Sequence, residues 1–505
     1  MNKHLTIIFS VLFSLLASLL FGQNNSQIVL TLDQAIDIAQ DSSLRAFISK
    51  NEYLSDYWDY RAYKAEYLPT LRLEATPFNY QRAVNSEYNS EEEEYQFIQN
   101  ESIKSSANLS LTQNIPVTGG RIYIDSDLGR IQNIGGQSEN SSTPVRIGIR
   151  QNIFDFNWLK WETKTQPIEF ERAKKELFQS SQEIANNTVN RFFDLLVAQI
   201  NLRIANNDQT NTKILYSDGL KRSEKDSISL EDMYSLELSL MDANSSFERA
   251  ESRFRRAQTR LLSFLRLDKN LDVVLNPPID IPQIQINDTL ALLKARENNP
   301  DILDFRLNRV WAEREVEKAK KSRFSAGLNL SLGLNQTSTN KKVINVYRNL
   351  ETQQRVEVSL NIPIIDWGLS KNRYNLAKKD QEVVLARMEQ KEIDFNENVR
   401  INVEEFNMQN QLVLRAAKAD TLAQMMYDVT QQRYLKGEID IIKLHSAQNK
   451  KNSSRKEYFE ELERYWECYY DIRELTLYDF ILNREITIYS TIIYDMEGME
   501  SLIEN

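Results

Sequence analysis

The sequence predicts an α+β membrane protein in which a transmembrane β-sheet adjoins very long α-helices. Three observations predict this class. An apolar segment at the N-terminus marks the chain for export, apolar and polar residues alternate in several short stretches, and two long segments are almost free of helix-breaking residues. Glycine and proline number only 13 and 10 among 505 residues, which is typical of long uninterrupted helices rather than of a loop-rich fold.

The N-terminus has the pattern of a secretory signal peptide. Lys3 and His4 precede an apolar run from Leu5 to Phe21, and a small residue, Gly22, ends it. We predict that residues 1–22 are removed and that the chain is exported. A membrane anchor is the alternative, but the run is at the short limit for a span and no charged residues follow it to stop transfer.

Composition and motifs argue against nucleic-acid binding and catalysis. The net charge is −10 and no basic block is present, so we expect no nucleic-acid partner. The sequence contains neither a phosphate-binding glycine loop nor a nucleophile elbow. His445 is interpreted as a packing or surface residue and Cys468 as a core residue, so we expect no enzyme activity, no metal site and no cofactor.

Six segments alternate between apolar and polar residues, which gives a strand one face of each kind. They are residues 71–75, 107–115, 122–126, 145–149, 328–334 and 356–362. They contain 5 to 9 residues each, enough for the central part of a barrel strand of roughly 9–11 residues. We therefore favour strands with lipid on one side and water on the other, over the alternative of a half-buried sheet in a soluble domain.

The segments around these strands fit a membrane barrel. Residues 82–102 and 133–143 are polar and are expected to be exposed loops. Aromatic residues are expected near the strand ends, where an interfacial girdle would lie: Phe78, Tyr80, Phe154, Phe156, Phe324 and Trp367.

Long helices are predicted on either side of the strands. Residues 162–216 contain no glycine and only Pro167, which we assign to the first turn of the helix, and residues 369–435 contain neither glycine nor proline. At about 1.5 Å per residue these helices extend roughly 80 and 100 Å, so we expect coiled-coil packing. A cytoskeletal or adaptor coiled coil is the alternative, against which the signal peptide and the strands argue.

An internal repeat relates the two halves of the chain. Residues 153–157 parallel residues 364–368 at an offset of 211, whereas residues 39–43 align with residues 295–299 at an offset of 256. The first half therefore carries 45 additional residues, the length of one more hairpin with its loop. We assign this hairpin to residues 105–144.

The chain resembles the outer-membrane efflux proteins typified by TolC in several motifs, in the order of these motifs and in their occurrence in both halves. The motifs are LTLDQAIDIA at 30–39, YLP at 67–69, TLALLKARENNP at 289–300, NIPIIDWG at 361–368 and RYLKG at 433–437. The resemblance implies a homotrimer that shares one β-barrel in the outer-membrane lipid, a periplasmic helical tunnel, and partners that comprise a periplasmic adaptor protein and an inner-membrane transporter. It implies an exit duct for efflux or secretion, of unspecified substrate.

Two features depart from the family pattern. In this family each subunit usually contributes four strands to a twelve-stranded barrel, whereas six strands are predicted for this chain. Either all six insert and widen the pore, or the additional hairpin folds back as an extracellular or luminal element; the sequence leaves both open.

The second departure concerns the periplasmic gate, where the family closes its tunnel with helix turns ringed by acidic residues. The corresponding turns here are residues 225–232 and 437–446. In the second half of the chain, the positions that carry the acidic ring in the family are occupied by Lys443 and Ser446. The candidate gate residues are Glu231, Asp232, Gly437, Glu438, Asp440, Lys443 and Ser446. Gly437 is assigned a turn role because glycine adopts positive φ without strain.

The predicted organisation divides the chain into eight segments. Residues 1–22 are the signal peptide, 23–67 the first equatorial and tunnel helices, 68–156 the first barrel strands, 157–275 the long helices with their tip, 276–323 the second linker and helices, 324–366 the second barrel strands, 367–475 the second long helices with their tip, and 476–505 a C-terminal equatorial segment. A secreted or periplasmic coiled-coil structural protein without a pore remains the alternative function.

Overall fold

The computed structural model describes residues 28–89, 93–224, 229–269, 271–323, 325–338, 343–348, 350–436, 438–439 and 441–486. The predicted signal peptide lies outside these residues. The described chain forms two compact units. The helical unit comprises residues 28–51, 175–299 and 396–486, and the sheet unit comprises the described parts of 52–174 and 300–395.

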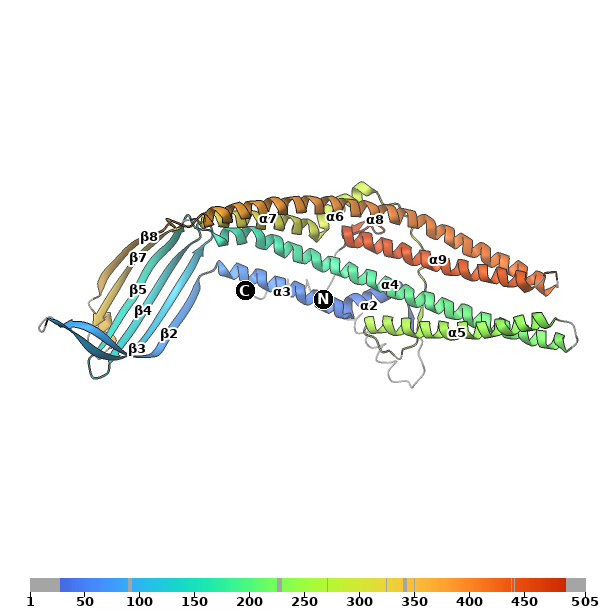
Figure 1. Cartoon of the computed structure of the whole chain (residues 1–505), viewed down its shortest axis with the longest axis horizontal. Coiled ribbons are helices and arrows are strands. Elements are labelled where there is room, and N and C mark those ends of the chain that lie inside the picture. The colour runs from blue at the N-terminus through green and yellow to red at the C-terminus, as the bar shows by residue number, and fades with distance from the viewer. Residues whose placement is uncertain are drawn as a thin grey trace, which may run out of the picture. The chain divides into compact units, whose positions relative to one another are not determined.

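The sheet unit contains one antiparallel sheet of six strands in the order β2-β3-β4-β5-β7-β8 (Figure 1). The strands are β2 Thr70–Asn89, β3 Glu94–Ile115, β4 Gly120–Asn133, β5 Ser138–Ile153, β7 Ser325–Ser338 and β8 Glu351–Asn361. Each of the six alternating segments coincides with a different strand, although residues 356–362 run one residue beyond the end of β8, so these six strand predictions are confirmed. The additional hairpin, β3–β4, is paired on both sides and does not fold back.

The strands are longer than predicted, and several assignments next to them were wrong. Residues 82–102 are not a loop, because β2 and β3 continue their pairing to Asn89 and Glu94. Most of residues 133–143 likewise belongs to β5 or to the end of β4. Phe78 and Tyr80 lie inside β2 rather than at its end. In residues 82–102, apolar and aromatic side chains (Val84, Tyr88, Tyr95 and Phe97) share one face with the polar Ser86 and Gln99. The alternation is therefore interrupted, whereas ladder pairing depends on the backbone.

The helices occur as pairs of nearly equal length. α2 Leu32–Ser42 and α6 Asp288–Asn298 have 11 residues each, α3 Leu44–Glu66 and α7 Pro300–Lys321 have 23 and 22, α4 Trp158–Ser223 and α8 Leu369–Leu435 have 66 and 67, and α5 Leu230–Phe264 and α9 Ile441–Thr476 have 35 and 36. The two predicted long helices lie within α4 and α8. Among the described helices, none is long and apolar enough to cross a membrane.

Pro167 lies inside α4 and not in its first turn, contrary to prediction. The helix begins earlier because the side chain of Asn157 accepts a hydrogen bond from the backbone N–H of Lys160 at 3.1 Å and so caps it. The ring of Pro167 removes one backbone donor, and a helix of 66 residues tolerates that loss.

The core of the helical unit is formed by large side chains on α4, α5 and α9. Phe192 and Phe193 on α4, Leu261 on α5, and Tyr465 and Tyr469 on α9 are almost fully buried. Burying each such side chain contributes about 1.5–3 kcal/mol relative to exposure. Two short strands, β1 Ile28–Leu30 and β6 Val273–Leu275, pair in parallel in this unit. Beyond α9, β9 Tyr478–Asp479 and β10 Arg484–Glu485 form a small antiparallel pair.

Candidate channel surface and helix tips

The six-stranded sheet has one apolar face and one polar face. Across the ladders, Leu111 pairs with both Leu71 and Ile124, and the same row continues through Ile147 to Leu332. These side chains are exposed, as are further members of the same face: Leu73, Leu109, Ile122, Leu330, Val356, Val358 and Leu360. A contiguous exposed apolar patch of this kind indicates contact with lipid or with another protein.

The opposite face carries charged and polar side chains around a hollow of about 530 Å³. Arg146 on β5 makes ion pairs with Asp125 at 2.9 Å and with Asp127 at 2.8 Å, both on β4. The amide of Asn108 on β3 also donates to Asp127. These contacts fix charged groups from two strands and a polar amide from a third on one surface, which water can solvate but lipid cannot.

Tyr123 lines the hollow on this polar face. Its hydroxyl donates a hydrogen bond to Oδ1 of Asn329 on β7 at 3.1 Å. The guanidinium carbon of Arg150 lies 5.8 Å from the centroid of the Tyr123 ring, within the range of a cation–π contact. The aromatic ring therefore connects strands β4, β5 and β7 on the polar side of the sheet.

Both edge strands of the sheet lack a partner on their outer side within the described residues. β2 forms one edge and β8 the other, and every residue of β8 is exposed. Such an edge presents unpaired backbone N–H and C=O groups, which another strand can satisfy.

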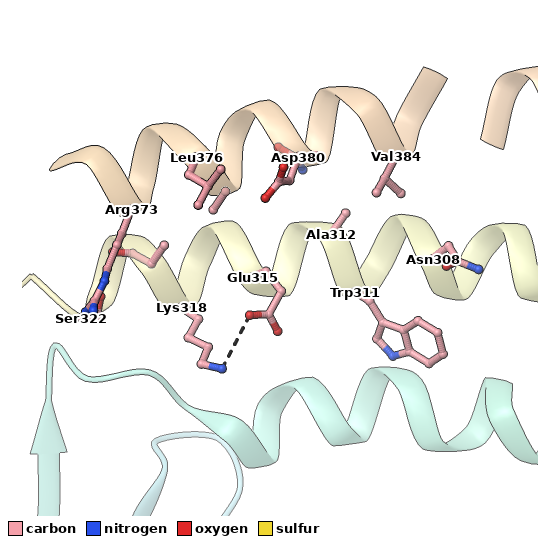
Figure 2. Close-up of a pocket in the computed structure, with 13 residues that line it drawn as sticks. Asn308, Trp311, Ala312, Glu315, Lys318, Ser322, Arg373, Leu376, Asp380 and Val384 are labelled. Atoms are coloured by element: carbon pink, nitrogen blue, oxygen red, sulfur yellow. Dashed lines mark hydrogen bonds and ion pairs between the residues drawn. The ribbon is translucent and has the colours of Figure 1, made fainter. Parts of the chain in front are cut away.

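A groove of about 610 Å³ runs between α7 and α8 in the sheet unit (Figure 2). Small or apolar side chains form much of its wall, among them Ala312 on α7 and Leu376 and Val384 on α8. An ion pair of 3.6 Å joins Lys318 to Glu315 within α7. The sequence analysis did not single out this groove, because its walls come from helices that are distant in the chain.

Of the seven candidate gate residues, four have described side chains, and all four are exposed: Glu231, Glu438, Lys443 and Ser446. Glu438 forms an ion pair of 3.1 Å with Arg433, so its carboxylate is neutralised locally. Lys443 and Ser446 lie on the first turns of α9. Asp232 lies in α5, and Gly437 and Asp440 fall outside the described residues.

The helical unit also contains a polar cluster that the sequence analysis missed. Asp208 on α4 accepts hydrogen bonds from the amides of Gln448 and, at 3.0 Å, Asn452, both on α9. The ammonium of Lys451 lies 3.8 Å from the centroid of the Tyr427 ring. Burial raises the pKa of Asp208 and lowers the pKa of Lys451. In the sequence this cluster appears only as polar residues at helical spacing, and such a pattern usually marks a helix face exposed to solvent.

Cys468 was interpreted as a core residue and His445 as a packing or surface residue. Cys468 is buried among aromatic residues of α9, and burial raises the pKa of its thiol to about 11, so it is not activated as a nucleophile. His445 is half-buried on α9, and the described residues contain no cluster of three or more side chains able to hold a metal ion.

Residues 291–466 match the sequence model of the family described as outer membrane efflux protein. No curated protein matches the chain. Among solved structures, the Campylobacter jejuni CmeC outer membrane channel is similar, with a TM-score of 0.66 and 13% identity over 92% of this chain and 88% of that one. The outer-membrane channel OprN gives a TM-score of 0.62 and 15% identity, over 88% and 89% of the two chains.

The outer membrane protein VceC from Vibrio cholerae gives a TM-score of 0.60 and 11% identity, over 90% of this chain and 97% of that one. At these identities the likeness establishes a shared fold. Residues 291–466 therefore match the outer membrane efflux protein family in sequence, and the chain shares its fold with these outer-membrane channels.

Proposed function

We propose that this protein is an outer-membrane channel that serves as the exit duct of an efflux or secretion system. The observation that carries the proposal is the two-faced sheet. Its exposed apolar face suits lipid, while the opposite face, with the Arg146–Asp125 pair, suits a water-filled pore. The family and the resemblance to efflux channels agree with this reading.

The open edges of the sheet support assembly of three copies into one barrel. A sheet in lipid must close, because unpaired backbone groups cannot be solvated there. The outer edge of β8 in one copy would pair with β2 of the next, and the resemblance to the TolC family implies three copies. Six strands per subunit then give eighteen. With strands about 4.8 Å apart and tilted by about 40°, the barrel is about 36 Å wide between backbones, against about 24 Å for twelve strands.

The equal helix lengths support a two-fold internal repeat. α2 to α5 match α6 to α9 within one residue each, and the offset of 256 that aligns residues 39–43 with 295–299 also brings the start of β2 to within one residue of the start of β7. The additional strands are then β3 and β4. In this organisation residues 68–156 and 324–366 supply the barrel, and the long helices supply a periplasmic tunnel that meets an adaptor protein and an inner-membrane transporter.

Fractionation and electrical recording test the proposal. The full chain should fractionate with the outer membrane, migrate as a trimer before heating, and form ion-conducting pores in a planar bilayer. A structural coiled-coil protein would be soluble and would produce no pores, and that result would overturn the channel assignment.

Crosslinking tests the seam between subunits. Leu73 on β2 and Val358 on β8 lie on the apolar face, and the only native cysteine, Cys468, is buried. In Leu73→Cys/Val358→Cys, a bismaleimide of about 10 Å reach cannot bridge the two sites within one chain, since five strand spacings of about 4.8 Å separate them. Covalent dimers and trimers are expected in membranes; exclusively monomeric product, with the single-cysteine variants as controls, would contradict the seam.

A further inference from the structure

Two arginines stand directly opposite each other on the polar face of the sheet. Arg121 on β4 and Arg150 on β5 are cross-strand partners, and both side chains are exposed. Like charges at such a position destabilise a sheet. The polar face therefore holds an unfavourable pair near the end of the sheet where β4 begins and β5 ends.

The neighbouring charges do not neutralise this pair. Asp125 is already engaged by Arg146 at 2.9 Å, and Arg150 contacts the Tyr123 ring. Among the described residues, neither Arg121 nor Arg150 has an ion-pair partner. The nearest carboxylate in the ladder beyond Arg150 is Glu357, which pairs with Asn329 and is separated from Arg150 by one strand.

The hollow on this face is consequently positive. Its wall contains four arginines and two carboxylates, and one of those carboxylates, Asp125, is held by Arg146. Arg355 on β8 adds a third guanidinium without an ion-pair partner in the described structure. This local excess contrasts with the chain as a whole, whose net charge is −10.

We propose that Arg121 and Arg150, repeated in each subunit, form an anion-binding girdle inside the barrel that favours substrates carrying several carboxylate, phosphate or sulfate groups. The inference rests on the proposed channel function. Because the girdle occupies the polar face, it meets solutes in the pore and not lipid head groups, which contact the apolar side. A multivalent anion bridging the two guanidinium groups relieves their repulsion and is attracted more strongly than chloride.

The test compares purified full-length trimers in planar bilayers. The permeability ratio of chloride to potassium is measured from reversal potentials in a KCl gradient, and block is measured with inorganic tripolyphosphate. Arg121→Gln/Arg150→Gln should lower the permeability ratio about threefold and weaken tripolyphosphate block about tenfold. Arg121→Lys/Arg150→Lys should retain the anion preference, and Arg121→Gln alone should give a smaller change of the same sign.

A matched control removes the same charge elsewhere on the sheet. Arg82 and Arg130 lie on β2 and β4 but do not line the hollow. If Arg82→Gln/Arg130→Gln changes selectivity as much as the girdle variant, or if a conducting girdle variant keeps wild-type selectivity and block, the girdle is refuted while the channel stands. Failure of the wild-type trimer to conduct would instead overturn the proposed function, and this inference with it.

Discussion

Tyr123 occupies the space that a side chain at position 148 would need. A Cβ added to Gly148 would lie 2.3 Å from Cζ of Tyr123 and 2.8 Å from the backbone oxygen of Leu330. Only glycine allows the ring to cross β5 and reach Asn329 on the next strand, at 3.1 Å. Gly148 is therefore needed for the close approach of the Tyr123 ring to the backbone of β5, and not for a turn.

Replacing Gly148 by alanine should destabilise the sheet by about 1–3 kcal/mol, since the ring must move and one of the three close atoms belongs to the backbone. The measurement is the temperature at which the assembled protein dissociates and unfolds. Gly129→Ala is the matched control, because its added Cβ meets only the hydroxyl of Ser141, which can rotate away. Equal thermal stability of the two variants would contradict the role assigned to Tyr123.

The helical unit should lose stability as pH rises from about 4.5 to about 7. Burial, followed by repulsion from Glu467 and Asp194, raises the pKa of Glu463 to about 7, and burial with repulsion from Glu183 raises the pKa of Glu474 to about 7. In the unfolded chain both groups titrate near 4.5. Between these values the folded protein holds more protons, so the free energy of unfolding falls as pH rises and levels off above pH 7.

The expected loss from these two groups is about 2 kcal/mol after allowance for solvent screening. Thermal unfolding between pH 5 and pH 8 measures it. Glu463→Gln/Glu474→Gln should flatten the profile and raise the melting temperature at pH 8. Glu457→Gln, at an exposed position of the same helix, should retain the wild-type slope. An unchanged slope in the double variant would rule out these two groups as its source.

The helix tip that begins α5 should contribute to gating. Glu231 is exposed there, and Asp232 is its neighbour in the same helix. Reversing both charges to lysine removes a carboxylate ring if the three tips meet, so block by divalent cations should weaken and conductance should change. Glu248→Lys, an exposed site farther along α5, is the control. Conductance and block identical to wild type would exclude these residues from the gate.

The sequence predicted the fold most reliably where chemistry differs between two faces. Alternation located all six strands because one face is apolar, and the repeat arithmetic assigned the additional hairpin to the region of β3–β4. Alternation failed in residues 82–102, where polar residues such as Ser86 and Gln99 interrupt the face that carries Tyr95 and Phe97. Pro167 was misplaced because the start of α4 depends on the Asn157 cap, which the periodicity of apolar residues does not report.

The candidate site was predicted less completely than the fold. Alternation identified a polar face, but the Arg146–Asp125–Asp127 cluster depends on which strands are neighbours, and that order emerges only from the sheet. The Asp208 cluster similarly joins helices separated by 240 residues or more. At the tips, sequence position identified Glu438 as a candidate but gave no sign that Arg433 neutralises it.

All six strands of each subunit should enter one closed barrel. The measurement is a count of the strands around the pore by electron cryomicroscopy of the full-length trimer in lipid nanodiscs. Eighteen strands are expected, with β8 of each subunit paired to β2 of the next. A twelve-stranded barrel with β3–β4 outside the wall, or an open sheet in each subunit, would contradict this expectation.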